Sequence, residues 1–125
     1  MNIYQEQILE HYKDPQNYGE LKNATHRNCA LNPTCGDKIC IDLHINQNII
    51  QEISFNGSGC AISQATASML TEKVKGQTID YLTKIDKDDI LKMLEIELSM
   101  NRLKCGVLAL EASHRALNNP LKEIK

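Results

Sequence analysis

Residues 38–45 alternate between apolar and polar side chains more regularly than any other part of this chain. The apolar positions are Ile39, Ile41, Leu43 and Ile45. Because successive side chains on a strand point to opposite faces, the pattern predicts a strand with one packed face and one face in water. A second run covers residues 49–56, in which Ile49, Ile53 and Phe55 share a face and Gln51 is the exception. Asn46-Gln47-Asn48 lies between the runs, so the sequence predicts a turn and an antiparallel hairpin.

Helical periodicity surrounds this hairpin. Apolar spacing, capping residues and terminating residues predict helices over residues 3–13, 61–75, 78–83, 86–100 and 105–117. Residues 16–33 are polar and irregular, which predicts a surface loop and leaves a short edge strand open as an alternative. We find no internal repeat and no linker. The sequence therefore predicts one α+β domain over residues 1–125, a small antiparallel sheet packed on one face by helices.

Composition excludes several classes of function. The chain has 14 basic and 16 acidic residues, a formal net charge of -2, so it lacks the strong positive field that nucleic acids attract. It has five aromatic residues and no Trp, which disfavours a platform for base stacking. The longest apolar run, residues 107–110, is too short to cross a membrane. The first six residues do not resemble a signal peptide, so we expect a cytoplasmic protein.

The number of cysteines is the most informative part of the composition. The five thiols are Cys29, Cys35, Cys40, Cys60 and Cys105. Without a secretion signal, this enrichment argues against a framework of disulfides and favours metal binding or thiol chemistry. An odd number of cysteines also cannot pair completely.

Three of the cysteines lie at predicted element boundaries. Cys35 precedes the hairpin, and Cys60 and Cys105 stand where predicted helices begin. The partial positive charge of a helix N-terminus favours a thiolate there. Asp37 follows Cys35 by two residues, so both side chains can converge on one ion in extended chain. Three thiolates and a carboxylate suit tetrahedral Zn²⁺ or the edge of an iron–sulfur cluster, although spacing alone leaves three unconnected cysteines equally open.

Several segments around these residues resemble one family. Residues 32–37 (Asn-Pro-Thr-Cys-Gly-Asp), 57–63 (Gly-Ser-Gly-Cys-Ala-Ile-Ser) and 102–105 (Arg-Leu-Lys-Cys) are similar to the three signature segments of the IscU/SufU/NifU-N iron–sulfur cluster assembly family. Residues 3–15 resemble the opening helix of the family, and residues 71–76 resemble the segment after its middle cysteine. The similarity extends over nearly the whole chain.

The resemblance implies a metal site and a sulfur acceptor. It implies that Cys35, Asp37, Cys60 and Cys105 bind zinc. It also implies that Cys35 accepts persulfide sulfur from a cysteine desulfurase, a PLP-dependent enzyme of the SufS type. Lys104, directly before the third cysteine, favours the SufU branch. The chain nevertheless lacks the insertion that SufU proteins usually carry, since Cys60 and Cys105 are 45 positions apart, which is closer to the IscU pattern.

Three functions follow as hypotheses. The first is a zinc-dependent sulfur acceptor in iron–sulfur cluster biogenesis, which would make the chain a sulfurtransferase that transfers persulfide sulfur. The second is a scaffold on which Cys35, Cys60 and Cys105 hold a transient [2Fe–2S] cluster for transfer to downstream apo-proteins, with Asp37 making the site labile. The third is a zinc-stabilised structural or adaptor domain without chemistry. Whether the chain is an enzyme therefore stays open at this point.

The other conspicuous side chains have simpler interpretations. We expect Cys29 and Cys40 to be bystanders, Cys40 on the polar side of its strand. Lys104 either steers an anionic persulfide or is a solvated residue, and the second interpretation is favoured. His114 falls on an apolar helical stripe, which favours a packed or half-exposed role over metal ligation.

Overall fold

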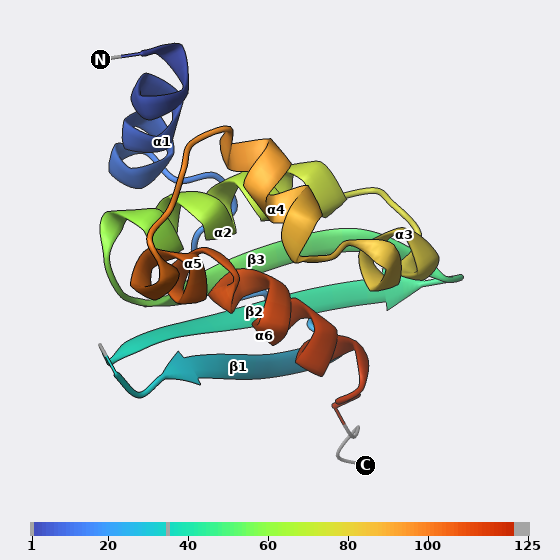
Figure 1. Cartoon of the computed structure of the whole chain (residues 1–125). Helices are drawn as coiled ribbons and strands as arrows, with labels where there is room; N and C mark the ends of the chain where they lie inside the picture. Colours follow the sequence, from blue (N-terminus) through green and yellow to red (C-terminus); the bar gives the residue numbers. More distant parts are fainter. Residues whose placement is uncertain (1, 35, 122–125) are drawn as a thin grey trace.

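The computed structural model describes residues 2–34 and 36–121, and its helices lie on one face of a three-stranded sheet (Figure 1). This arrangement confirms the predicted α+β fold. The elements in chain order are α1 (Ile3–Lys13), β1 (His26–Asn32), β2 (Asp37–Asn46), β3 (Ile49–Ser58), α2 (Ala61–Val74), α3 (Ile79–Lys84), α4 (Lys87–Leu94), α5 (Met100–Gly106) and α6 (Leu108–Leu117).

The predicted hairpin forms the centre and one side of the sheet. β2 pairs with β3 in antiparallel register, and the two-residue turn between them has φ values of 52° at Gln47 and 64° at Asn48. Two positive φ values suit the right-handed twist of a tight hairpin. A register shift lies between His44 and Ile45, so Ile50 is fully buried in place of the expected Ile49. The bulge explains why the alternation predicted for the second strand fails near Gln51.

The segment 16–33 contains a complete strand, which corrects the prediction of a loop. β1 pairs with β2 along its whole length, from His26 opposite Leu43 to Asn32 opposite Asp37. The strand order of the sheet is β1-β2-β3, so β1 is an edge strand. This is the short edge strand that the sequence had left open as an alternative to a loop. Polar residues such as Asn and Arg are frequent in β1, so its intrinsic preference for strand structure is weak. It forms a strand because it pairs with β2.

Two cysteines that we expected to be bystanders form a disulfide. Cys29 and Cys40 are directly opposite each other in the β1–β2 register, and their sulfurs are bonded. The expectation of no disulfide was wrong because the partner strand of Cys40 was not recognised in the sequence. Cys40 does lie on the polar side of β2, away from the buried Ile39 and Ile41.

The core lies between the sheet and the helices that cover it, chiefly α2 and α6. α6 packs on β1 and β2, α2 packs on β3 and on α6, and α1 packs on α2 (Figure 1). The largest fully buried apolar side chains are Phe55, Ile39, Ile41, Leu43, Ile50, Ile53, Leu70, Leu82, Ile90, Leu94, Leu108 and Val74. This packing fixes the first residue of β2 against the first residues of α2, which places the site described below.

The opposite face of the sheet carries an ion pair between a buried carboxylate, Asp42, and a partly exposed guanidinium, Arg27. Asp42 is fully buried, and Arg27 Nε and Nη2 donate to its two carboxylate oxygens at 2.7 and 3.0 Å. The backbone N–H of Leu21 donates to the same carboxylate at 3.0 Å. Because a buried carboxylate needs such partners, this pair holds the segment before β1 against the sheet.

The C-terminal helices differ from the prediction. The expected helix over residues 86–100 ends at Leu94, because Glu95 adopts a left-handed conformation with φ 52°. A separate helix, α5, begins after Ser99, whose side chain accepts a hydrogen bond from the N–H of Arg102. α6 then begins at Leu108 rather than at residue 105. Within residues 2–34 and 36–121, helices are too short and too polar to cross a membrane.

Candidate metal and thiol site

Three of the four predicted ligands converge at one end of the sheet. One donor atom from each of Asp37, Cys60 and Cys105 lies within 4.8 Å of the others. Asp37 is the first residue of β2, Cys60 is the N-cap of α2, and Cys105 lies near the end of α5. The fourth predicted ligand and predicted sulfur acceptor, Cys35, lies outside the described residues. The grouping therefore joins residues up to 68 positions apart in sequence, from 37 to 105.

The carboxylate of Asp37 is buried and held by donors from α2. The backbone N–H of Cys60 donates to its Oδ2 at 3.2 Å, and Ser63 Oγ donates to the same oxygen at 3.0 Å. Burial raises the pKa of Asp37, but the hydrogen bonds from Cys60, Ser63 and Cys105 outweigh this effect, so its pKa is lowered overall. Asp37 is thus an ionised, oriented oxygen donor.

Gly59 and Ser63, at the N-terminal end of α2, make the close contact between α2 and Asp37 possible. Gly59 carries no side chain, and a Cβ there would lie 2.4 Å from Ser63 Oγ and 2.9 Å from Asp37 Cγ. Ser63 is fully buried, and its hydroxyl also lies 3.1 Å from the carbonyl of Cys60. Ser63 was not among the predicted site residues. Ser63 lies three residues after the helix cap Cys60, and residues three apart lie on the same side of a helix. This spacing was the signal that could have placed Ser63 at the site.

Asn32 is a second residue that the sequence analysis did not assign to the site. It is buried at the end of β1, and its Nδ2 donates to Cys105 Sγ at 3.9 Å. Its Oδ1 accepts from the N–H of Thr34 at 3.2 Å, and its carbonyl accepts from the N–H of Gly36 at 2.8 Å. Asn32 therefore connects the turn before Asp37 to the thiol on α5.

The two described thiols have different settings. Cys60 is exposed and is the N-cap of α2, with its Sγ 3.6 Å from Ser63 Oγ, which confirms its predicted place at a helix N-terminus. Cys105 is buried in the last turn of α5. The predicted helix start at Cys105 is wrong, so the favourable helix dipole invoked for its thiolate is absent. Contacts from Asp37 and Asn32 provide its polar surroundings instead.

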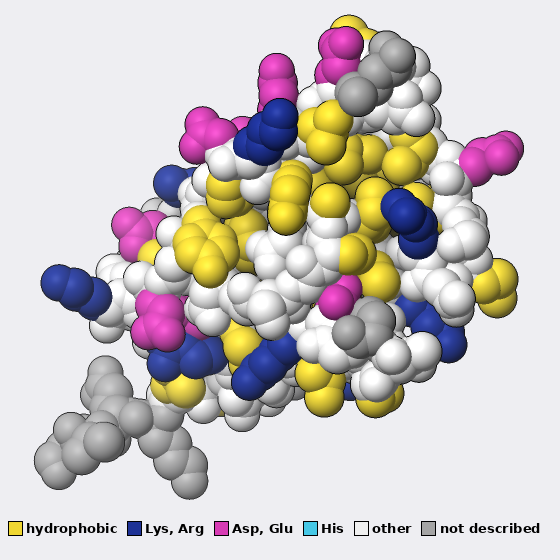
Figure 2. All heavy atoms as spheres, turned by 90° about the vertical axis from the view of Figure 1, so that its left-hand side faces the viewer, with side chains coloured by type: hydrophobic (Ala, Val, Ile, Leu, Met, Phe, Trp, Pro, Cys, Tyr) yellow, Lys and Arg dark blue, Asp and Glu magenta, His cyan; other side chains and the backbone are white. Residues whose placement is uncertain are grey.

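An apolar pocket of about 700 Å³ opens beside these donors. Its lining residues come from α1, the end of β1, α2, α5 and the adjoining turns: Gln5, Ile8, Leu9, Asn32, Thr34, Cys60, Ala61, Ile62, Ile96, Asn101, Arg102, Lys104 and Cys105. Figure 2 shows hydrophobic side chains gathered on this face, with Lys and Arg side chains at the border. The thiols thus lie at the edge of a surface that is partly apolar and partly basic.

The remaining conspicuous residues are not part of the donor group. Lys104 is exposed and lines the pocket beside Cys105, so its position fits a solvated residue at the mouth of the site. His114 is half-buried on α6, and its Nε2 lies 2.9 Å from the carbonyl of Leu82. This is the packed or half-exposed role that the sequence favoured.

The donor set fits zinc. Zn²⁺ prefers thiolate, imidazole and carboxylate ligands in tetrahedral sites, and two sulfurs and a carboxylate oxygen already lie close together here. Ser63 and Asn32 supply the hydrogen bonds that orient such ligands from outside. A tetrahedral site would need one further ligand beyond these three.

The chain is similar to several known proteins. The family model of the NifU-like N terminal domain matches residues 3–124. The iron–sulfur cluster assembly scaffold protein IscU 1 of Archaeoglobus fulgidus is 35% identical over 115 residues, covering 92% of this chain and 74% of that protein. The zinc-dependent sulfurtransferase SufU of Bacillus subtilis is 31% identical over 132 residues, covering 92% and 89%. A crystal structure described as a hypothetical protein superposes with a TM-score of 0.80 at 28% identity, covering 94% of this chain and 98% of that one.

Proposed function

Because this chain belongs to the NifU-like N-terminal domain family, together with IscU and SufU proteins of iron–sulfur cluster assembly, we propose that it is a zinc-dependent sulfur acceptor. In this function Cys35, Asp37, Cys60 and Cys105 hold the zinc ion, and Cys35 takes sulfur from the persulfide of a PLP-dependent cysteine desulfurase. The relative named a zinc-dependent sulfurtransferase supports this choice.

One observation carries the proposal. Asp37, Cys60 and Cys105 bring their donor atoms within 4.8 Å of one another, and the carboxylate is fixed by two hydrogen bonds. Zinc bound there holds thiols as thiolates near neutral pH. The apolar pocket beside the donors gives an incoming protein segment a surface on which to place its sulfur next to the site.

The transfer step is thiol–persulfide exchange. The Cys35 thiolate attacks the outer sulfur of the donor persulfide and forms a new S–S bond. The bond between the two donor sulfurs breaks, and the donor cysteine leaves as a thiolate. Asp37, Cys60 and Cys105 would hold the metal while Cys35 is engaged. A donor complex in which Cys35 remains bound to zinc would contradict this order of events.

Metal content tests the proposal first. Protein purified anaerobically without added metal is analysed for zinc, iron and sulfide, together with its visible absorption. We expect one tightly bound zinc and no iron–sulfur chromophore. The protein is then incubated with a cysteine desulfurase and cysteine, and the added sulfur is located by peptide mapping. We expect it on Cys35 and absent in Cys35→Ser, whose circular dichroism controls for folding. An unfolded Cys35→Ser, together with no added sulfur on the wild type, would favour a structural zinc domain.

A scaffold is the second candidate function. The relative from Archaeoglobus is named a scaffold protein, and the 45-residue spacing from Cys60 to Cys105 resembles the IscU pattern. In this function Cys35, Cys60 and Cys105 hold a [2Fe–2S] cluster for downstream apo-proteins. Iron and sulfide in equal amounts with a visible chromophore would favour the scaffold over the sulfur acceptor.

A further inference from the structure

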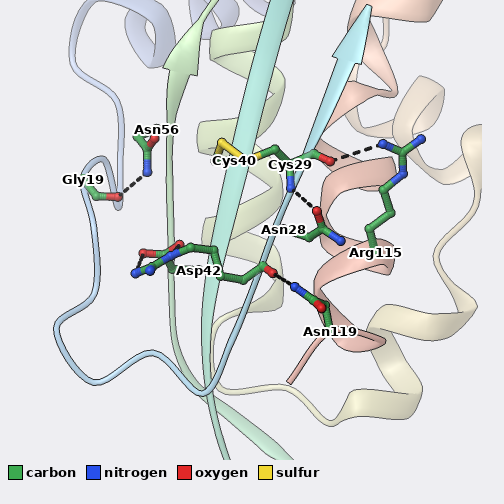
Figure 3. The surroundings of a disulfide bond; sticks show 9 residues. Gly19, Asn28, Cys29, Cys40, Asp42, Asn56, Arg115 and Asn119 are labelled. Atoms are coloured by element: carbon green, nitrogen blue, oxygen red, sulfur yellow. Dashed lines mark hydrogen bonds and ion pairs between the residues drawn. A yellow bond between two sulfur atoms is a disulfide. The ribbon is translucent and has the colours of Figure 1, made fainter. Parts of the chain in front are cut away.

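A second sulfur centre lies outside the metal site, where the Cys29–Cys40 disulfide joins β1 to β2 (Figure 3). The N–H of Cys29 donates to Asn28 Oδ1 at 2.8 Å, and its carbonyl accepts from Arg115 Nη1 at 3.2 Å. Both backbone groups therefore point away from β2. Cys29 and Cys40 form a non-hydrogen-bonded pair, the position at which opposing side chains in an antiparallel sheet lie closest. Their Cα atoms are 4.0 Å apart.

This disulfide is open to reagents without disruption of the core. Cys29 and Cys40 are both half-buried, on the face of the sheet opposite to the buried Ile39 and Ile41. The helices cover the other face (Figure 1). Backbone pairing from residue 26 to residue 32 holds β1 on β2 independently of the covalent bond. A thiolate can therefore reach the disulfide while the fold stays intact.

The same two strands lead directly to the metal site. Three residues after Cys29, β1 ends at Asn32, which contacts Cys105. Three residues before Cys40, β2 begins at Asp37, which is opposite Asn32 in the register. The disulfide therefore restrains an edge strand close to the point where that strand touches the site. Cys60 and Cys105 must be reduced to bind metal, whereas Cys29 and Cys40 are oxidised.

We propose that Cys29 and Cys40 are a redox-active pair that exchanges with a dithiol reductant, and that the state of this pair changes how tightly the neighbouring site holds metal. A thiolate of the reductant attacks one sulfur of the disulfide and forms a mixed disulfide. The second thiol of the reductant then displaces the protein sulfur. The protein gains two protons and two electrons as two thiols, and the reductant becomes a disulfide. The effect on metal rests on the proposed function, and the exchange itself does not.

Reduction loosens the site for a structural reason. Without the disulfide, the end of β1 loses its covalent restraint and is held by its backbone ladder and its packing against α6, so Asn32 is less firmly placed against Cys105. Hydrogen-bond partners outside the ligand shell commonly affect metal affinity by about tenfold or more. We expect zinc to leave the reduced protein about tenfold faster than the oxidised protein.

The first experiment measures the exchange on the full-length, zinc-loaded protein. Samples are equilibrated anaerobically with increasing dithiothreitol, quenched, alkylated and mapped by mass spectrometry. We expect Cys29 and Cys40 to become alkylated together, in one transition, while the far-ultraviolet circular dichroism is unchanged. If both remain unlabelled until the protein unfolds, the disulfide is a structural crosslink and the proposal is wrong.

The second experiment measures the effect on metal. Reduced and oxidised proteins are separated from reductant by anaerobic desalting and reloaded with zinc, and zinc release to a chromogenic chelator is followed. Equal release from both states overturns the coupling. Failure of both states to bind zinc contradicts the proposed function instead, so the two failures are distinguishable. The variant Cys29→Ser/Cys40→Ser is the matched control, and it should release zinc as the reduced protein does, with or without prior reduction. The wild-type comparison decides the result if this variant does not fold.

Discussion

Replacing Gly59 with Ala tests whether the close approach of α2 to Asp37 builds the metal site. No positive φ is found at Gly59, so Ala can adopt its backbone conformation without strain. The added Cβ would lie 2.4 Å from Ser63 Oγ, 2.9 Å from Asp37 Cγ and 3.0 Å from Asp37 Oδ2. Since ordinary contact begins at 3.4 Å, the hydroxyl must move by about 1 Å and the carboxylate by about 0.5 Å.

These movements break hydrogen bonds to a charged group. The bond from Ser63 Oγ is 3.0 Å long and the bond from the Cys60 N–H is 3.2 Å long, so the displacement removes at least the first. A hydrogen bond to a charged group is worth about 1.5–3 kcal/mol. We expect Gly59→Ala to lower the free energy of unfolding of the metal-free protein by about 2 kcal/mol. Zinc affinity should fall about 30-fold, because 1.4 kcal/mol corresponds to tenfold.

Urea denaturation and zinc competition with a chromogenic chelator measure the two effects. Gly19→Ala is the control, since Gly19 has φ 127° but no heavy atom within 4 Å of the added Cβ, so it reports backbone strain without a collision. Gly59→Ala/Ser63→Ala removes the nearest colliding atom and should recover part of the stability but little of the affinity. A Gly59→Ala protein that binds zinc within about threefold of wild type would refute the role assigned to this contact.

Three further predictions follow from the described contacts. Arg27→Met leaves the buried carboxylate of Asp42 without its ion pair and should lower the free energy of unfolding by about 3 kcal/mol, measured with urea, while Arg27→Met/Asp42→Leu should recover most of this loss. Burial lowers the pKa of His26 below its usual 6.5, so the unfolded chain takes up a proton first as the pH falls. The stability that His26 contributes is therefore present above pH 6.5 and decreases below it, and His26→Gln should flatten the slope of unfolding free energy between neutral pH and about pH 5.5. Asn32→Ala removes the amide that contacts Cys105 and should speed zinc release by about tenfold, and an unchanged rate would show that this contact does not support the metal.

The hairpin and most helices were predictable because they depend on local patterns. The alternation over residues 38–45 produced β2, and the glycines before Cys60 marked the start of α2. The break between α4 and α5 was not predictable in this way. It depends on a left-handed conformation at Glu95, a residue type that does not favour it, followed by a new cap at Ser99.

The identities of the candidate ligands came from sequence, and their surroundings came from the fold. Motifs and spacing singled out Asp37, Cys60 and Cys105, which the structure brings together. The partners Ser63 and Asn32 were missed: the spacing of Ser63 from the helix cap was a signal that was not used, and the amide of Asn32 carries no signal until its neighbour Cys105 is known. The favourable dipole assigned to Cys105 failed because a helix boundary moved by a few residues.

The sequence by itself determined the local order of the chain: an alternating hairpin, helices that follow it, and thiol and carboxylate ligands at element ends. These properties follow from side-chain periodicity and capping, which act over a few residues. Only the tertiary structure decided that residues 26–32 form a strand, and with it that Cys29 faces Cys40. Strand pairing joins distant segments through backbone hydrogen bonds and shared burial. The residues next to Cys29 in the sequence therefore do not indicate that Cys40 is its partner, and the residues next to Cys40 do not indicate Cys29.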